Sequence, residues 1–437
     1  MKSIMIVAGT RPEIIKLAPV IKWLEKLGEE YIFVWSGQHY DYELSRIFFE
    51  QLRIPEPDED LNVGSGTHAE QTAKMMVGLE RLIQKYSPAI VVAEGDTNTV
   101  VASSLTALKC LVPFAHVEAG LRSWNMSMPE EVNRKIADAL ASVCFAPTKL
   151  AVINLLFEGV SRKFIHLTGN TIVDVVYEYK EYVMRKGDET LARFDLDKYD
   201  FILVTLHRAE NTVNRERLRS ILAAFSELSE YYRIVFPMHP RTRNAIVKFG
   251  LGDYLKKIEV LDPLGYLEFL GLLANSRVVL TDSGGVQEES LTLKVPTVTL
   301  RYNTERPETT MFHVNVLAGA DKDRIVKLAL MQAERAEKIR RLSFENPFGD
   351  GYAGKRITQI LKEALENRLD IKEPDLRETP AIEYRLLEED CLENSSLFDL
   401  LVAFDGDGRP ILSESGTLKF LARIKGRFND KGSFDSK

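Results

Sequence analysis

The feature that most constrains this sequence is an order of three segments that recurs along it: a short apolar run, a polar turn with glycine, and a stretch with helical spacing. In the first copy, the apolar run is Lys2 to Ala8 and the turn is Gly9 to Glu13, and apolar residues then recur at helical spacing from Ile14 to Leu24. Strands that alternate with helices predict parallel sheets with right-handed crossovers. We therefore expect an α/β fold.

Two halves of the chain share this architecture, although the sequence shows no clear internal repeat. Residues 1–170 are predicted to form one Rossmann-like, doubly wound domain, and residues 171–368 a second one, whose last helix packs back on the first. A helix from Ile172 to Met184 is expected to connect them, followed by a polar bridge from Arg185 to Tyr199. Two such domains would place their strand-end loops across a cleft.

Residues 369–437 differ in composition and are predicted to form a C-terminal extension. After an acidic stretch, the segments Leu397 to Phe404 and Pro410 to Leu412 flank a glycine turn at Asp405 to Gly408. This pattern predicts a small β-hairpin. The polar end of the chain, Lys425 to Lys437, is predicted to be disordered.

Composition and charge argue against several classes of function. The chain has a net charge of −7 and no basic stripe, which argues against nucleic acid as a partner. No apolar run reaches the roughly 18 residues that a membrane helix needs, and the apolar start is too short for a signal peptide. Cys110, Cys144 and Cys391 have no disulfide or zinc-site spacing. We therefore expect a cytoplasmic protein without a metal site.

The stretch from His116 to Arg134 places charged residues between a predicted strand and a predicted helix. The strand is predicted over Cys110 to Ala115 and the helix over Glu131 to Ala141, with Pro129 near the helix start. Open α/β sheets bind ligands at such connections. This one carries three carboxylates and two arginines: Glu118, Glu130, Glu131, Arg122 and Arg134.

Other polar loops should lie beside this stretch, because the carboxyl ends of parallel strands meet at one edge of a sheet. The loops that follow predicted strands in the first half contain Gly9, Gln38, Asp96 and Glu118. Arg11 and Lys16 could face a phosphate or a sugar carboxylate, and the start of their helix offers N–H groups to an anion. The turn before them lacks the GxGxxG spacing, so we predict no dinucleotide cofactor.

A phosphate site is predicted in the second half of the chain. The strand Val278 to Thr281 runs into Asp282 to Gly285 and then into a helix. A serine and two glycines at a helix N-terminus form a nest of N–H groups that suits a diphosphate. Glu289 lies far enough round this helix to accept two ribose hydroxyls, and Arg306 is a further candidate phosphate partner. This arrangement suits a nucleotide-sugar held across the cleft.

Taken together, the motifs resemble those of the non-hydrolysing UDP-N-acetylglucosamine 2-epimerases, in the family's order over roughly residues 1–368. The stretches that carry the resemblance are Gly9 to Glu13, Gly37 to His39, Gly95 to Thr97, His116 to Ser123, Pro129 to Arg134, His207 to Asn211, Asp282 to Glu289 and Glu305 to Glu308. The resemblance implies a two-domain fold of the GT-B type, a homodimer, and a role in cell-surface polysaccharide biosynthesis.

The resemblance also implies an activity, the conversion of UDP-N-acetylglucosamine to UDP-N-acetylmannosamine by anti elimination of UDP to 2-acetamidoglucal and re-addition. This chemistry needs neither metal nor cofactor. Asp96, Glu118 and Glu130 match the acidic positions of the family, and His207 matches a residue that assists the departing UDP. The positions implied to contact the UDP-sugar are Arg11, Lys16, Gln38, His39, Arg122, Glu131, Arg134, Arg208, His239, Ser283, Gly284, Gly285, Glu289 and Arg306.

Two details bear on the choice of ligands. Gln38, Glu131, Arg208 and His239 match positions where some bacterial members bind a second, activating UDP-N-acetylglucosamine. Ala209 stands where many members carry a second arginine, which weighs against that activator site. The link from Arg122 to Asn125 also resembles the subgroup that acts on UDP-2,3-diacetamido-glucuronate.

Four alternative functions stay open at this point. The chain could act on the diacetamido-glucuronate, or it could be a hydrolysing epimerase that releases free sugar. A retaining glycosyltransferase of the same fold would share the phosphate nest without needing the acids around Glu118. A non-catalytic sensor of nucleotide-sugars would have no reason to keep Asp96, Glu118 and Glu130.

Overall fold

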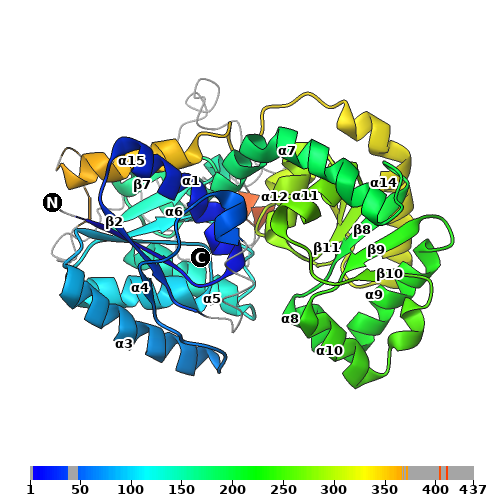
Figure 1. Cartoon of the computed structure of the whole chain (residues 1–437), viewed down its shortest axis with the longest axis horizontal. Helices are drawn as coiled ribbons and strands as arrows, with labels where there is room; N and C mark the ends of the chain where they lie inside the picture. Colours follow the sequence, from blue (N-terminus) through cyan, green and yellow to red (C-terminus); the bar gives the residue numbers. More distant parts are fainter. Residues whose placement is uncertain are drawn as a thin grey trace, which may run out of the picture.

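Two parallel β-sheets, each covered by helices on both faces, organise the chain (Figure 1). The computed structural model describes residues 3–37, 48–366, 368, 371–372, 403–404 and 410–411. Within these residues, every strand pair of the two large sheets is parallel. The α/β class predicted from the alternation of strands and helices is therefore confirmed.

The first sheet has seven strands in the order β3-β2-β1-β4-β5-β6-β7. Along β1, Ile4 and Ile6 pack into the core on one face of the sheet, whereas Met5 and Val7 pack into the core on the other. A strand buried on both faces reads as a continuous apolar run, which is why the sequence locates it. The strands are β1 (Ile4–Ala8), β2 (Tyr31–Trp35), β3 (Glu59–Asp60), β4 (Ile90–Glu94), β5 (Phe114–Val117), β6 (Val143–Ala146) and β7 (Ile165–Leu167).

The second sheet repeats this order with six strands, β10-β9-β8-β11-β12-β13. They are β8 (Phe201–Thr205), β9 (Arg233–Pro237), β10 (Glu259–Leu261), β11 (Val278–Thr281), β12 (Thr297–Thr299) and β13 (Asn315–Leu317). In each sheet the first strand lies in the middle, later strands are added on one side of it, and the order then reverses to the other side. This reversal of strand order lies between β1 and β4 in the first sheet and between β8 and β11 in the second. Such reversals open a crevice at the carboxyl ends of the strands, where open α/β sheets bind ligands.

Helices and short helical turns fill the connections. Those of the first half are α1 (Arg11–Leu27), α3 (His68–Tyr86), α4 (Asn98–Lys109), α5 (Pro129–Leu140), α6 (Lys149–Phe157) and the 3₁₀ turn η1 (Arg162–Phe164). Those of the second half are α7 (Thr171–Arg193), α8 (Ala209–Thr212), α9 (Arg215–Leu228), α10 (Pro240–Phe249), the 3₁₀ turn η2 (Gly252–Leu255), α11 (Tyr266–Asn275), α12 (Gly284–Leu293), α13 (Glu308–Met311), α14 (Lys322–Arg340) and α15 (Ala353–Leu365).

The strand before the His116 stretch was predicted too early in the chain. Cys110 ends α4, and Leu111 is 74% exposed with a φ of +59°. β5 begins only at Phe114, so His116 lies inside the strand and not in the loop after it. The apolar character of Cys110 to Ala115 suggested a strand over the whole segment. Pro113 and the left-handed turn at Leu111 prevent a strand over its first residues.

The connection between the two halves is one longer helix, α7, which continues to Arg193, so the predicted end at Met184 and polar bridge from Arg185 were wrong. Gly187 lies inside this helix without breaking it, and it faces Gly271 of α11 where the two helices cross closely. A Cβ on Gly271 would lie 2.9 Å from the Gly187 Cα. Glycine in a helix costs about 1 kcal/mol relative to alanine, and here it permits the contact between the helices.

Among the elements of the second half that the sequence analysis did not predict are β13 and α14. Asn315 of β13 is buried and donates to Gln287 Oε1 at 3.1 Å and to Thr309 Oγ1 at 2.9 Å. A strand of three residues that carries an asparagine gives little apolar signal. Its place comes from pairing with β12 in the sheet.

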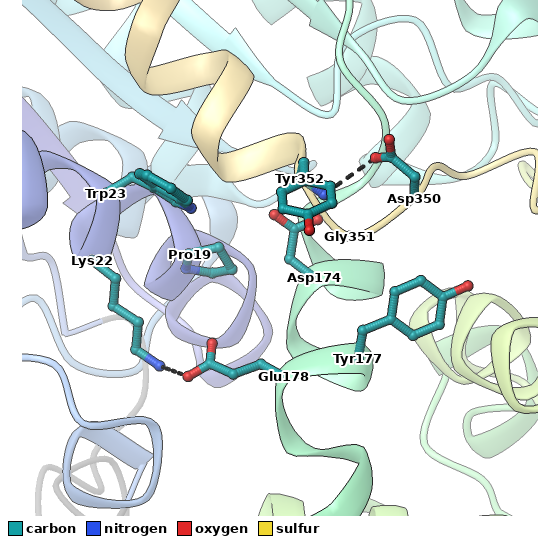
Figure 2. A pocket seen from close by; sticks show the side chains of 9 residues that line it. All are labelled: Pro19, Lys22, Trp23, Asp174, Tyr177, Glu178, Asp350, Gly351 and Tyr352. Carbon is teal, nitrogen blue, oxygen red and sulfur yellow. Dashed lines mark hydrogen bonds and ion pairs between the residues drawn. The ribbon is translucent and has the colours of Figure 1, made fainter.

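The last described helix, α15, crosses back to the first half and packs along α1 (Figure 1). Thr358 Oγ1 donates to the Val20 carbonyl at 3.3 Å, and Asp174 of α7 accepts the Ala353 and Gly354 N–H groups at 3.0 and 2.7 Å. A cavity of about 240 Å³ lies at this three-way junction, and Figure 2 shows the side chains that line it. Its walls come from α1, from α7 and from the link before α15: Pro19, Lys22, Trp23, Asp174, Tyr177, Glu178, Asp350, Gly351 and Tyr352.

Only small parts of the predicted C-terminal extension fall within the description. Ala403–Phe404 pairs antiparallel with Pro410–Ile411, in agreement with the predicted hairpin. The predicted disorder of Lys425 to Lys437 lies outside the described residues. Within the described part of the chain, no helix combines the length and the apolar character that crossing a membrane requires.

Replacing Gly354 by alanine should destabilise the fold through the contact between α15 and α1. An added Cβ would lie 2.7 Å from the Pro19 Cβ and 2.8 Å from its carbonyl carbon, and backbone atoms cannot easily give way. We expect Gly354→Ala to lower the free energy of unfolding in urea by about 1–3 kcal/mol. Gly252→Ala is the matched control, because its added Cβ meets no atom within 4 Å. Equal stability of the two variants would contradict this account.

Candidate active site

Buried charged groups from both halves meet where the two strand-order reversals face each other. Lys16 of α1 is 6% exposed, and its Nζ lies 2.9 Å from Glu94 Oε1 at the end of β4. The same ammonium group also pairs with Glu118, which directly follows β5. Lys16 thus joins two neighbouring strand ends of the first sheet.

Glu118 is the carboxylate that joins the two halves. Its Oε1 lies 2.8 Å from Arg306 Nη2 of the second half, and its Oε2 accepts a hydrogen bond from Asn170 Nδ2 at 2.8 Å. Burial by itself would raise the pKa of Glu118, but Lys16 and Arg306 together hold it below its usual range. Glu118 is therefore ionised and fully engaged when no ligand is bound.

Backbone conformation singles out the same loops. Glu118 has a φ of +70°, a left-handed conformation that costs energy for a residue with a Cβ and recurs at functional sites. Gly95 has a φ of +83°, and a Cβ added to it would meet no atom within 4 Å. The loop between β4 and α4 therefore borders open space beside Asp96.

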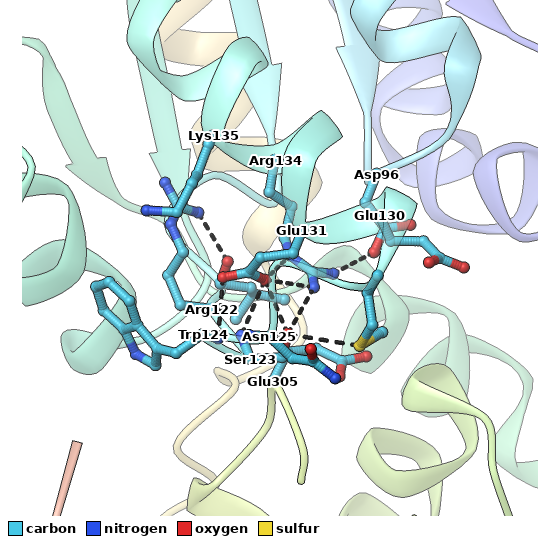
Figure 3. Close-up of polar contacts among 12 residues, drawn as sticks. Asp96, Arg122, Ser123, Trp124, Asn125, Glu130, Glu131, Arg134, Lys135 and Glu305 are labelled. Atoms are coloured by element: carbon cyan, nitrogen blue, oxygen red, sulfur yellow. Dashed lines mark hydrogen bonds and ion pairs between the residues drawn. The ribbon is translucent and has the colours of Figure 1, made fainter. Parts of the chain in front are cut away.

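Arg134 of α5 connects two of the predicted site residues (Figure 3). Its Nη1 pairs with Asp96, and its Nη2 lies 2.7 Å from Glu131 Oε2. Glu131 is fully buried and also accepts hydrogen bonds from the Ser123 and Trp124 N–H groups, both at 3.0 Å. Both oxygens of Glu131 are thus occupied inside the chain, where they fix the loop before α5.

Glu130, the neighbour of Glu131, points instead to the second half. Its Oε1 accepts a hydrogen bond from Arg208 Nη1 at 2.7 Å. Burial would raise the pKa of Glu130, but the Arg208 guanidinium lowers it overall. Arg208 Nη2 also lies 3.7 Å from Glu305 Oε1, a fully buried carboxylate. The ion pairs of Glu118 and of Glu130 both cross between the halves and hold the two strand-end edges together.

His207 follows β8 and is held by Asp282, which follows β11. Asp282 is fully buried and accepts hydrogen bonds from the His207 and Arg208 N–H groups at 3.1 and 2.9 Å. The His207 Nδ1 lies 3.4 Å from Asp282 Oδ1. Burial lowers the pKa of His207, against the opposing effect of Asp282. His239 has its ring centroid 5.8 Å from that of His207, and it caps α10 by accepting the Arg241 N–H.

The predicted phosphate nest is the N-terminus of α12, with Ser283 as its N-cap residue. A Cβ on Gly284 would lie 2.6 Å from Arg306 Nη1, so the guanidinium lies directly against the nest. A Cβ on Gly285 would meet no atom within 4 Å, so space is open there. An anion at the N–H groups of α12 would therefore lie within reach of Arg306.

Glu289 lies on the second turn of α12 and is 5% exposed. Burial raises its pKa to about 8, although Tyr266 acts in the opposite direction. Its carboxyl group is therefore largely protonated at neutral pH in the absence of a ligand.

The turn at Gly9 does not offer its N–H groups to a ligand as predicted. The Gly9 and Thr10 N–H groups donate to Glu13 Oε2 at 2.5 and 2.8 Å. An added Cβ on Gly9 would lie 2.1 Å from Ser36 Oγ. The glycine serves close packing of β1 against its neighbours, and a carboxylate from the chain itself fills the anion position.

The remaining predicted residues lie in different places. Arg122 is 3% exposed and pairs with Asp138 Oδ2 at 2.7 Å and with Glu158, away from Glu118. The Arg11 guanidinium lies 5.6 Å from the centre of the Phe48 ring. Gln38 and His39 lie outside the described residues.

Several residues of this charge network were missed by the sequence analysis. They are Glu13, Glu94, Asp138, Asn170, Asp282, Glu288, Glu305 and Arg301. Glu94 carried a signal that could have found it, because an acid that ends a fully apolar strand must be paired. Asn170 bridges Glu118 and Glu288 at 2.8 Å each and carried no such signal, because its role depends on three separate elements. Within the described residues, no group of His, Cys, Asp and Glu side chains is arranged to hold a metal ion.

Comparison with known proteins gives consistent matches over most of the chain. A family model described as UDP-N-acetylglucosamine 2-epimerase matches residues 23–362. UDP-N-acetylglucosamine 2-epimerase of Methanocaldococcus jannaschii is 46% identical over 367 residues, which cover 82% of this chain and 98% of the relative. UDP-2,3-diacetamido-2,3-dideoxy-D-glucuronate 2-epimerase of Pseudomonas aeruginosa is 41% identical over 362 residues, which cover 82% of this chain and 99% of the relative.

A solved structure extends this similarity to three dimensions. The crystal structure of the M. jannaschii UDP-GlcNAc 2-epimerase, in complex with UDP-GlcNAc and UDP, superposes with a TM-score of 0.76 at 46% sequence identity. The match covers 83% of this chain and 99% of that chain. The predicted GT-B-like arrangement of two domains agrees with this match.

The buried Glu289 carboxyl group should make the stability of the ligand-free protein depend on pH. Its folded pKa of about 8 lies above the ordinary value of 4.5, so the folded state binds the proton more tightly than the unfolded state. The free energy of unfolding should therefore fall as the pH rises from 4.5 to 8, by up to about 1.4 kcal/mol per pH unit from this group. Glu289→Gln should flatten this slope in urea unfolding. Glu337→Gln, at a side chain 65% exposed, should leave the slope as it is.

Proposed function

This chain belongs to the UDP-N-acetylglucosamine 2-epimerase family, and we propose that it inverts C2 of UDP-N-acetylglucosamine to give UDP-N-acetylmannosamine. The reaction is an anti elimination of UDP to 2-acetamidoglucal, followed by re-addition of UDP to C1 and of a proton to the other face of C2. The observation that carries the proposal is the buried Glu118 carboxylate between Lys16 and Arg306, at the junction of the two strand-end edges.

The first step needs a positioned base, because the C2–H group is only weakly acidic. A carboxylate takes the C2 proton, the C2–H electron pair forms a C1=C2 double bond, and the C1–O bond electrons leave with UDP. The reverse step needs an acid on the opposite face. Asp96, Glu118 and Glu130 are our candidates for these roles, because all three follow strands or begin a helix at this edge and each is paired with an arginine or lysine.

Substrate binding itself could turn Glu118 into a better base. A diphosphate at the N-terminus of α12 would draw the Arg306 guanidinium, which already lies against Gly284. Glu118 would then lose one of its two cationic partners, and its pKa would rise. Deprotonation of C2 would thereby require a bound nucleotide.

The departing UDP carries negative charge that preorganised donors can stabilise. The N–H groups at Ser283 to Gly285, the Arg306 guanidinium and the side chain of His207 are the groups that we assign to this task. This assignment is supported by the location of these groups, which all follow the carboxyl ends of β8, β11 and β12. Glu289, on the same helix as the nest, is our candidate for the ribose hydroxyls.

A second candidate substrate is the UDP-linked 2,3-diacetamido-glucuronate. The relative from P. aeruginosa, named for that activity, is 41% identical to this chain over 362 residues. The two sugars differ by a carboxylate at C6 and an amide at C3, whereas C2 and the UDP group are the same. The chemistry described above therefore applies to both.

Three finer expectations belong to the same proposal. We propose a cytoplasmic homodimer that supplies a precursor for cell-surface polysaccharide, as the family resemblance implies. The remaining predicted contacts to the UDP-sugar, among them Arg11, Arg122 and Arg134, are part of the proposal as well. Arg208 and His239, with Gln38 and Glu131, are the residues that we propose for any second nucleotide-sugar.

Proton NMR of the purified protein with UDP-N-acetylglucosamine in deuterated water tests the proposal. We expect UDP-N-acetylmannosamine beside the substrate, with deuterium at C2 of both, and without added metal or cofactor. Turnover of the diacetamido-glucuronate alone would select the second candidate. Free N-acetylmannosamine with UDP would identify a hydrolysing enzyme, and binding without turnover of either sugar would identify a sensor. Both of these results would refute the proposal.

Replacement of Glu118 by glutamine should separate chemistry from nucleotide binding. We expect C2 deuterium exchange to fall by about 10²–10⁴-fold, as for loss of a general base or acid. The dissociation constant for UDP, measured by calorimetry, should decrease, because Arg306 loses a competing carboxylate. The matched control is Glu178→Gln, which removes a carboxylate paired with Lys22 on the far side of α1 and should change neither quantity. Weaker UDP binding in Glu118→Gln would contradict the proposed competition for Arg306.

A further inference from the structure

A second buried charged pair, His116 with Asp138, lies beneath the loops that carry Asp96 and Glu118. His116 is fully buried in β5, and Asp138 is 1% exposed in α5. The His116 Nδ1 lies 2.6 Å from Asp138 Oδ1, and its Nε2 lies 2.8 Å from the carbonyl oxygen of Gly95. The reaction proposed above uses neither residue.

One end of this pair holds the loop of Asp96. Gly95 directly precedes Asp96, so the bond from His116 to the Gly95 carbonyl fixes the peptide from which Asp96 extends. The Gly95 N–H group donates to the Val117 carbonyl at 3.1 Å. With a φ of +83° and open space around its Cα, Gly95 has no side chain to restrain it. Its carbonyl bond to His116 therefore limits how this loop can move.

The other end holds the loop of Glu118. Asp138 Oδ2 accepts the Gly120 N–H group at 3.0 Å, two residues after Glu118. Gly120 also packs against helix α6, where an added Cβ would lie 2.3 Å from the Ala151 carbonyl oxygen. A left-handed backbone such as that of Glu118 persists only where the surrounding structure restrains it. The bond to Asp138 is such a restraint.

Both ring nitrogens of His116 face hydrogen-bond acceptors, a carboxylate and a carbonyl. The ring therefore lies between the Asp138 carboxylate and the Gly95 carbonyl and connects them. Asp138 stays ionised because Arg122 Nη2 lies 2.7 Å from its Oδ2. The other titratable groups around the pair, from β6, α5, α6 and the segment after α15, are Cys144, Lys135, Glu158 and Lys372.

We propose that His116 and Asp138 form a positioning pair that fixes the Asp96 and Glu118 loops relative to one another. A reaction that removes a proton from one face of a carbon and returns one to the other face needs acids at a constant separation. The pair supplies this constraint from below the site, without touching the substrate. The inference rests on the proposed function and adds positioning residues to it.

The kinetic test uses His116→Gln and Asp138→Asn in the full chain. Misplacement of a catalytic group by about 1 Å can cost on the order of 10²-fold in rate, so we expect kcat for C2 exchange to fall by about that factor. KM and the dissociation constant for UDP should change little, because the UDP-binding groups lie in the second half. The double variant should lose little more than either single variant, because both changes break one unit.

His166→Gln is the matched control, because His166 lies in β7 of the same sheet, away from the strand-order reversal. It should keep the wild-type kcat. An unchanged kcat in His116→Gln would overturn the proposal. So would a loss of UDP affinity and melting temperature in proportion to kcat, because that pattern identifies a general structural role.

A second measurement does not depend on turnover. In protein labelled with ¹⁵N-histidine, the signals of His116, assigned by their loss in His116→Gln, should shift in Asp138→Asn, because the two side chains share a hydrogen bond. Signals of His116 that stay unchanged in Asp138→Asn would overturn the proposal even if the enzyme is active. If the wild type turns over neither candidate sugar, the proposed function fails, and this spectrum still decides whether the pair exists as described.

Discussion

The ion pair between Glu118 and Arg306 is the interaction on which the rest of this structure depends. Each member is buried and comes from a different half of the chain, so loss of either one would leave the other with an incompletely paired buried charge. Lys16 and Glu288 extend the network on either side. The same groups that close the two halves on one another are therefore the groups available to a ligand, and a bound diphosphate must redistribute their charges.

This redistribution connects the architecture with the chemistry. In the ligand-free protein, the Glu118 carboxylate is stabilised by two cations and is a poor base. In the proposed reaction, a nucleotide would withdraw Arg306 from Glu118, because Arg306 lies against the N-terminus of α12, whereas Lys16 is also anchored by Glu94. One buried arginine would then link the contact between the halves, nucleotide binding and the basicity of Glu118.

Secondary structure was predictable for several segments that are buried on both faces or have a long amphipathic period, although the long helix α14 was missed. β11 has the limits that the sequence predicts, Val278 to Thr281, and α1 includes the stretch of helical spacing from Ile14 to Leu24. The failures have local causes. Leu111 is apolar but exposed, Gly187 continues a helix because another glycine faces it, and β13 gains its place only by pairing with β12. The spacing of apolar residues along the sequence predicts neither the exposure of a single side chain nor the pairing of one strand with another.

The sequence by itself determined the α/β class, the two-fold repeat of the architecture and the loops where acids and glycines gather. Tertiary structure alone decided which of those side chains meet. Glu130 and Glu131 are adjacent, yet one reaches across to Arg208 and the other is enclosed by its own loop. Glu118 meets Arg306 from 188 positions away. Pairing of charges depends on distances that only the packed sheets and helices set, because electrostatic energy in a dry interior changes steeply over a few ångströms.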